Sequence, residues 1–174
     1  MDNMIFKRTS VRSYTDQPVT KEQIELLLRA GMAAPSACNA QPWEFIVVQN
    51  RETLIKITEI QPYSQMLKEA PLAIVVCADK TRTPAMLPDL QAWPMDCSAA
   101  TQNIMLEATE LGLGSVWLAT YPIEEISKPI GELLNLPQTI APFAMIAIGY
   151  PAGEVHPKDK FNPERIHWEK WSGK

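Results

Sequence analysis

The chain has 174 residues, of which 46% are hydrophobic and 21% are charged, and its formal net charge at pH 7 is −4. This balance is typical of a globular protein and argues against a disordered one, and we expect one domain over residues 1–174. The negative net charge gives no general attraction to nucleic acid or to an anionic membrane, so we predict neither as a partner. Any anion-binding site must therefore come from a few local basic residues.

The cysteines and the N-terminus indicate where the protein works. Cys38, Cys77 and Cys97 form no C-x-x-C pair, and two of them lie in apolar surroundings typical of buried free thiols. The first eight residues contain no apolar segment typical of a secretion signal, and no apolar run reaches the roughly 18 residues of a membrane span. We therefore predict a cytoplasmic protein.

In the first half of the chain, caps and apolar runs mark four elements. We predict a helix over 21–33, a strand over 45–48, a helix over 50–60 and a strand over 72–78. Thr20 and Gln23 form a capping box for the first helix, which Pro35 ends, and Asn50 can cap the second. Both strands are expected to be buried on two faces.

The second half of the chain alternates between helix and strand before it changes character. We predict a helix over 95–111, a strand over 115–119, an exposed helix over 123–134 and a strand over 143–148. Small and apolar residues cover much of the first of these helices, so we expect it to be buried nearly all round, as a central or dimer-core helix. The tail after Pro151 has no periodicity yet carries Phe161, Trp168 and Trp171, so we expect it to pack on the body or on a partner subunit.

This order of elements fits an α/β or α+β layered domain with a small sheet and helices on both faces. Gly112 and Gly114 resemble the start of a dinucleotide fingerprint, but the motif joins a helix to a strand, which is the reverse of the required order. We interpret the first glycine as a helix C-cap. Because no P-loop, nucleophile elbow or metal-binding histidine pair occurs, and His156 and His167 lie in the irregular tail, we predict no metal site and no triad hydrolysis.

Two polar segments suggest ligand chemistry. Arg8, Thr9, Ser10 and Arg12 place two guanidiniums and two hydroxyls within five residues, a set that can bind a phosphate monoester but could also be a solvated basic turn. Residues 34–43 combine small residues with the polar side chains of Ser36, Asn39 and Gln41. This mixture suits a flat heterocycle with polar edges, although the same residues could simply connect a helix to a strand with Trp43 in the core.

In this order, the two segments resemble the FMN-dependent nitroreductase family, and the resemblance extends along essentially the whole chain. Further matches are residues 111–117, 148–151 and 167–169. The resemblance implies an α+β fold with a central, small, mostly antiparallel sheet flanked by helices. It also implies an intertwined homodimer with FMN at the subunit interface and the C-terminal tail packed on the partner.

The resemblance assigns the cofactor contacts position by position. The residues implied are Arg8, Thr9, Ser10, Arg12, Pro35, Ser36, Ala37, Asn39, Gln41, Trp117, Leu118, Ala119, Lys158 and Lys160. Arg8, Ser10 and the tail lysines would hold the phosphate, although the family often has arginine at the second lysine, and Arg12 would lie near the N1/O2 side of the ring. Residues 35–39 would come from the other subunit, and residues 117–119 would lie along the ring, with a backbone N–H near Ala119 directed at N5.

The activity implied is that of an FMN-dependent NAD(P)H oxidoreductase, with NADH or NADPH as donor and a nitroaromatic, quinone or similar small molecule as acceptor. The expected cycle is ping-pong, with the hydride carried by flavin N5 and no catalytic side chain. Two alternatives remain open: an FMN-binding module without rapid turnover, acting as a redox sensor or flavin store, and a different reductive chemistry on the same scaffold. Residues 62–66 offer no clear match to the family's contact with the pyrimidine edge, and the loop over 79–93 is expected to shape substrate access.

Overall fold

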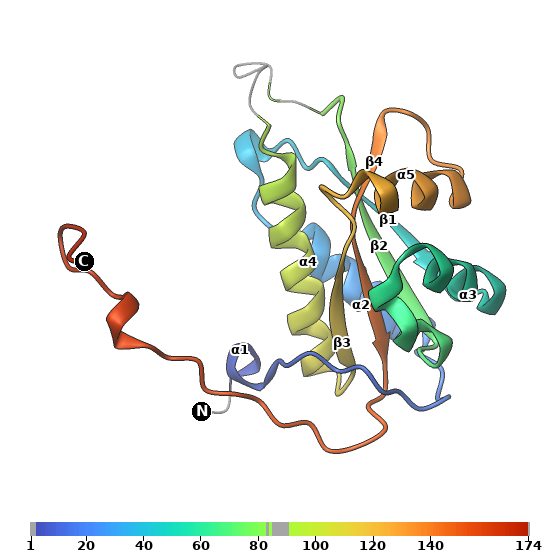
Figure 1. Cartoon of the computed structure of the whole chain (residues 1–174), viewed down its shortest axis with the longest axis horizontal. Helices are drawn as coiled ribbons and strands as arrows, with labels where there is room; N and C mark the ends of the chain where they lie inside the picture. The colour runs from blue at the N-terminus through green and yellow to red at the C-terminus, as the bar shows by residue number, and fades with distance from the viewer. Residues whose placement is uncertain (1–2, 83, 85–90, 174) are drawn as a thin grey trace.

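The fold, determined as a computed structural model that describes residues 3–82, 84 and 91–173, is built on a four-stranded sheet with strand order β1-β2-β4-β3 (Figure 1). The strands are β1 (Trp43–Val48), β2 (Leu72–Asp79), β3 (Gly114–Ala119) and β4 (Ile140–Gly149). Every neighbouring pair is antiparallel. The α+β class and all four predicted strands are therefore confirmed. β4 begins three residues earlier than predicted, because a β-bulge opposite residues 76 and 77 accommodates Pro142 in the strand.

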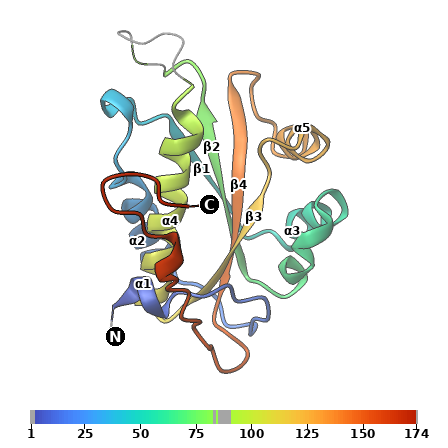
Figure 2. The same ribbon diagram turned by 60° about the vertical axis from the view of Figure 1, so that its left-hand side comes forward.

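Helices cover both faces of the sheet (Figure 2). They are α1 (Met4–Lys7), α2 (Lys21–Met32), α3 (Arg51–Ile60), α4 (Trp93–Glu110) and α5 (Glu124–Leu133), with 3-10 turns η1 (Ala37–Asn39), η2 (Pro62–Lys68) and η3 (Pro163–Arg165). The four predicted helices are confirmed, with ends shifted by at most two residues. The remaining elements are too short for apolar periodicity to predict them. No helix in the described ranges is both long enough and apolar enough to cross a membrane.

The core consists of two clusters, one on each face of the sheet. α2 and α4 pack with Ile74 and Ile146 on one face, whereas α3 and α5 pack with Val75 and Met145 on the other. The inner strand β2 is buried on both faces from Leu72 to Ala78, as predicted. The same prediction is wrong for β1, whose four middle residues are only half-buried, because β1 is an edge strand with a neighbour on one side.

Helix α4 is less buried than predicted. One side packs on α2 and the sheet, where Ile104 and Ala108 are inaccessible to solvent. On the other side Met95 is 65% exposed and Gln102 is also exposed. Burial nearly all round is therefore wrong for one chain, because complete burial needs a second surface against this side of α4.

The turn after α4 confirms the interpretation of Gly112 as a C-cap. Its φ of 73° lies in the left-handed region, where a residue without Cβ is favoured. Leu113 N donates to Ala108 O at 2.7 Å, and Gly112 N donates to Thr109 O at 3.2 Å, which is the pattern of a Schellman motif. The glycine ends the helix and turns the chain into β3.

The described cysteines are all free thiols. Cys77 and Cys97 are buried, as predicted, and burial raises the pKa of each thiol to about 12. Both therefore remain neutral thiols at physiological pH. Cys38 is exposed in η1.

The last part of the C-terminal tail, which carries its aromatic residues, extends away from the rest of the chain (Figure 1). Its aromatic side chains are among the most exposed of the described residues: Phe161 is 73%, Trp168 82% and Trp171 78% exposed. Packing on the chain's own body is therefore wrong. Packing on a partner subunit stays a prediction.

Candidate functional site

The beginning and the end of the folded chain meet at one end of the sheet. Residues 8–15, which we call the N-terminal strap, run past the start of β3, where Val11 N donates to Ser115 O at 3.0 Å. The chain leaves β4 beside the same strap, and Ala152 N donates to Ser13 O at 3.1 Å. Backbone hydrogen bonds therefore bring together two segments that lie about 140 positions apart in the sequence.

Tyr14 anchors the strap. Its buried hydroxyl lies 2.7 Å from Val11 O and 3.1 Å from Ala147 O, so it joins the strap to β4. Burial raises the pKa of Tyr14 well above its usual value, so the hydroxyl stays protonated and can donate. Gly114 allows the close approach on the other side, because a Cβ there would lie 2.7 Å from Val11 Cβ.

We expect Tyr14→Phe to reduce the free energy of unfolding by about 1–3 kcal/mol, because buried carbonyl oxygens lose their donor. Urea denaturation followed by fluorescence measures this change. Tyr63→Phe is the matched control, because Tyr63 is 81% exposed and should change stability by less than about 0.5 kcal/mol. Equal stability of both variants would contradict the anchoring role.

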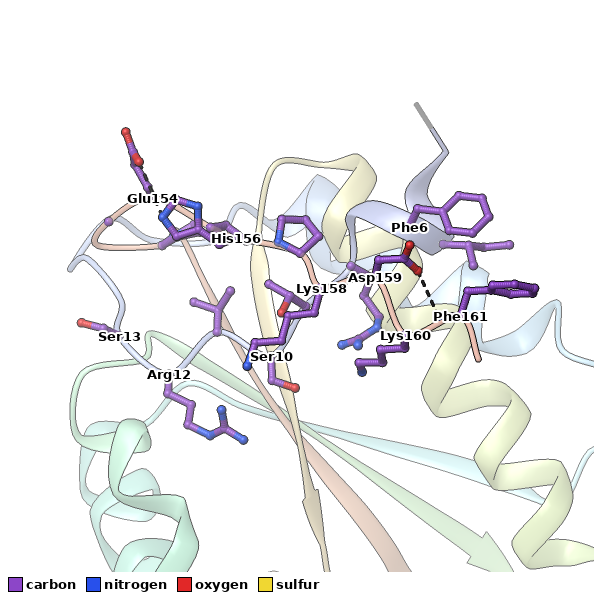
Figure 3. Close-up of a pocket in the computed structure, with 18 residues that line it drawn as sticks. Phe6, Ser10, Arg12, Ser13, Glu154, His156, Lys158, Asp159, Lys160 and Phe161 are labelled. Carbon is purple, nitrogen blue, oxygen red and sulfur yellow. Dashed lines mark hydrogen bonds and ion pairs between the residues drawn. The ribbon is translucent and has the colours of Figure 1, made fainter. Parts of the chain in front are cut away.

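Between the strap and the first part of the tail lies an open cavity of about 970 Å³ (Figure 3). The structure brings six of the fourteen predicted site residues together in its lining: Arg8, Thr9, Ser10, Arg12, Lys158 and Lys160. Lys158 and Lys160 extend from the tail toward the strap that carries Ser10 (Figure 3). Two hydroxyls and four cationic groups thus face one space.

The cavity has a positive balance of charge. Among the described residues, none of its two arginines and two lysines forms an ion pair or donates a side-chain hydrogen bond. Its two carboxylates have other contacts: Glu154 lies 3.6 Å from His156 Nε2, and Asp159 Oδ1 accepts a hydrogen bond from Phe161 N at 2.9 Å. Unpaired cations beside hydroxyl donors form a set that fits a phosphate group.

The predicted residues Trp117, Leu118 and Ala119 lie outside this cavity, farther along the same edge strand. Ser115 O accepts from the strap and Ala119 O accepts from Gln61 Nε2 at 2.7 Å, so odd-numbered residues of β3 direct their backbone polar groups away from β4. The N–H groups of Trp117 and Ala119 therefore lie on the free edge. The side chain of Leu118 points into the core beside α3 and α5, so only its backbone is available to a ligand.

The predicted segment 35–41 does not reach the cavity of its own chain. It forms a loop at the N-terminal end of α4, where Ala37 N donates to the buried Asp96 carboxylate at 3.0 Å. Cys38, Asn39 and Gln41 have φ values of 50°, 54° and 48°, a left-handed conformation that is unfavourable for residues with a Cβ. A strained, exposed loop held by a buried carboxylate is a frequent feature of ligand-binding sites.

The loop follows Pro35. Its polar side chains Ser36, Asn39 and Gln41 form hydrogen bonds within the loop. Ser36 Oγ accepts from Gln41 N, and Asn39 Oδ1 accepts from Gln41 Nε2, both at 2.9 Å. The loop is therefore preorganised. The predicted substrate loop over 79–93 lies partly outside the described residues.

Sequence reasoning missed three side chains that hold these segments in place: Tyr14, Gln61 and Asp96. Each acts through a backbone group far away in the sequence. No local sequence pattern distinguishes a tyrosine, glutamine or aspartate with such a role from one on the surface of the protein.

An antiparallel sheet between two helical layers, with a basic cavity at its β3 edge, defines the chain as an α+β protein with a cavity whose cations and hydroxyls fit a phosphate group. The model described as "Nitroreductase family" matches residues 5–64 and 60–150. The chain belongs to the nitroreductase family, and the resemblance identified from its motifs is confirmed.

Individual relatives agree with this membership over nearly the whole chain. An Archaeoglobus fulgidus protein provisionally named NADH dehydrogenase/NAD(P)H nitroreductase is 49% identical over 171 residues, which is 97% of each chain. A crystal structure with the same provisional name, from Parabacteroides distasonis, has 45% identity and a TM-score of 0.91 over 97% of this chain and 96% of that one. An FMN-dependent nitroreductase from Clostridium difficile has 33% identity and a TM-score of 0.88 over 98% of this chain and 100% of that one.

Proposed function

We propose that this chain is an FMN-dependent NAD(P)H oxidoreductase that reduces nitroaromatics, quinones or similar acceptors in a ping-pong cycle. The observation that carries the proposal is the cluster of four unpaired cations and two hydroxyls beside the free edge of β3. Family membership and the FMN-dependent relative support the choice of cofactor. When bound, FMN supplies the two-electron chemistry, accepting hydride from NADH or NADPH and passing electrons to the acceptor.

The chain's own residues bind and orient the cofactor. Arg8, Ser10, Lys158 and Lys160 hold the phosphate group, with Thr9 beside them. Arg12, in the same strap, places a positive charge on the N1/O2 side of the ring, where it favours the reduced anion. The edge of β3 supplies backbone N–H groups along the ring, and no side chain acts as a general acid or base.

The site requires a homodimer. Residues 35–41 are exposed or half-buried, preorganised and remote from the cavity of their own chain, so they are available to a ring bound by the partner. The exposed side of α4 and the aromatic tail provide the apolar surface that a large interface of about 2,000–5,000 Å² needs. We also propose a reducing cytoplasm as its location, because the exposed Cys38 is unpaired.

The visible spectrum of the purified protein, recorded before and after anaerobic addition of NADH or NADPH, tests the proposal. We expect flavin bands corresponding to about one FMN per chain that bleach with nucleotide and recover with a nitroaromatic or a quinone. Protein that cannot be loaded with FMN would refute the cofactor. Bound FMN that neither nucleotide reduces would favour a binding module, and bleaching without recovery by these acceptors would favour a different reductive chemistry.

We expect Arg12→Ala to lower the midpoint potential of bound FMN, because removal of a nearby positive charge disfavours the reduced anion. Equilibration with a reference dye measures the potential. Arg8→Ala is the comparison variant, because a phosphate contact should affect affinity and leave the potential unchanged. An unchanged potential and affinity in Arg12→Ala would reject the place assigned to Arg12.

A further inference from the structure

Gln61 makes a contact that the roles assigned so far do not explain. It follows α3 directly, and its side chain is buried with 2% of the residue exposed. Nε2 donates to Ala119 O at 2.7 Å, and Oε1 accepts from Tyr63 N at 3.1 Å. The amide is thus oriented at both ends, and one end reaches the last residue of β3 across 58 positions in the sequence.

Among the described residues, this end of β3 has β4 on one side and no strand on the other. β3 is the outer strand next to β4. Every second backbone carbonyl of β3 therefore points to the free edge, where it has no hydrogen-bond donor from a neighbouring strand. Thr120 N and Tyr121 N both donate to Phe143 O, at 3.3 and 2.9 Å, and they hold the chain on the β4 side only. On the free side, the side chain of Gln61 donates to Ala119 O the hydrogen bond that a neighbouring strand would otherwise donate.

The geometry of an extended residue links its two backbone groups. In a strand, the N–H and the C=O of one residue point to the same edge. A hydrogen bond that holds Ala119 O therefore also fixes the direction of Ala119 N–H. That N–H lies on the edge where the proposed function puts the flavin ring, and the side chain of Ala119 is small and exposed.

We propose that Gln61 is a positioning residue that directs Ala119 N–H toward N5 of the bound flavin. The inference rests on the proposed function, because it needs FMN along β3. Oxidised N5 accepts a hydrogen bond, whereas reduced N5 carries a proton, so a fixed N–H donor favours the oxidised form. Gln61 thereby tunes the potential without touching the cofactor.

Gln61→Met tests this role, because methionine has a similar length and no donor. We expect the midpoint potential of bound FMN to rise, and FMN affinity to fall by less than in Arg8→Ala. Gln65→Met is the matched control: Gln65 lies in η2, the 3-10 turn that directly follows Gln61, and its amide donates to Thr58 O at 3.0 Å without reaching β3. The control should keep the parent potential. A folded, FMN-loaded Gln61→Met protein with the parent potential would overturn the inference.

A second measurement uses the unchanged protein and does not depend on the stability of a variant. We expect hydrogen exchange of the Ala119 amide, followed by NMR, to slow when FMN binds, and exchange of Leu118, which faces β4, to change little. Equal exchange of Ala119 with and without FMN would overturn the inference. Failure of the parent protein to bind FMN would instead refute the proposed function, so the two failures are distinguishable.

Discussion

Arg8→Ala weakens FMN binding by about 10- to 150-fold and leaves riboflavin binding unchanged. A hydrogen bond to a charged group contributes about 1.5–3 kcal/mol, which corresponds to this range. Riboflavin lacks the phosphate, so it makes no use of Arg8, Lys158 or Lys160. Titration of the apoprotein with each flavin, followed by quenching of flavin fluorescence, gives both dissociation constants.

Three further variants test whether the effect of Arg8→Ala is specific to the phosphate. Arg29→Ala removes an exposed arginine that pairs with Glu25 on α2, outside the cavity, and should leave both affinities unchanged. Lys158→Ala and Lys160→Ala should each reproduce part of the loss for FMN alone. An equal loss of FMN and riboflavin affinity in Arg8→Ala would mean that Arg8 supports the ring or the fold and does not hold the phosphate.

Gly114→Ala reduces the free energy of unfolding by about 1–3 kcal/mol and weakens FMN binding as well, because a new Cβ forces the strap away from β3. The added atom would lie 2.7 Å from both Cβ and Cγ1 of Val11, closer than carbon atoms approach without displacement. The displaced strap carries Arg8, Ser10 and Arg12. Urea denaturation and flavin titration of the same preparation measure the two effects.

Two further glycines provide matched controls for the same substitution. A Cβ at Gly131, inside α5, meets no atom within 4 Å, so Gly131→Ala should stabilise the helix by about 0.5–1 kcal/mol. Gly112 is equally uncrowded but has a φ of 73°, so Gly112→Ala should cost about 1–2 kcal/mol through backbone strain. Neither should change FMN affinity as much as Gly114→Ala, and equal affinity in all three would contradict the role of the strap contact.

The location of the regular elements could be predicted from local sequence. The helix after Thr20 begins where its capping box lies, and α4 ends at the glycine C-cap. These features depend on residues within one or two turns, so the printed sequence contains all the information they need. The exposure of β1 could not be predicted in the same way, because a β-branched run looks alike in an edge strand and in an inner strand.

The residue types of the candidate site could be predicted from the sequence, whereas their arrangement around one cavity could not. The basic strap and the tail lysines are visible in the sequence as residue types, and the family motifs indicate that they belong to one site. Their common cavity depends on contacts across the whole chain, such as the bond from Ala152 to Ser13.

The positioning residues are a product of the tertiary structure alone. Tyr14, Gln61 and Asp96 each form a hydrogen bond with a backbone group that lies 58 or more positions away in the sequence. The sequence by itself determined the four strands, the four longer helices, the family and the charged groups that can hold a phosphate. Only the tertiary structure decided which buried polar side chains meet which backbone groups, because such pairs are set by packing and not by neighbours in the chain.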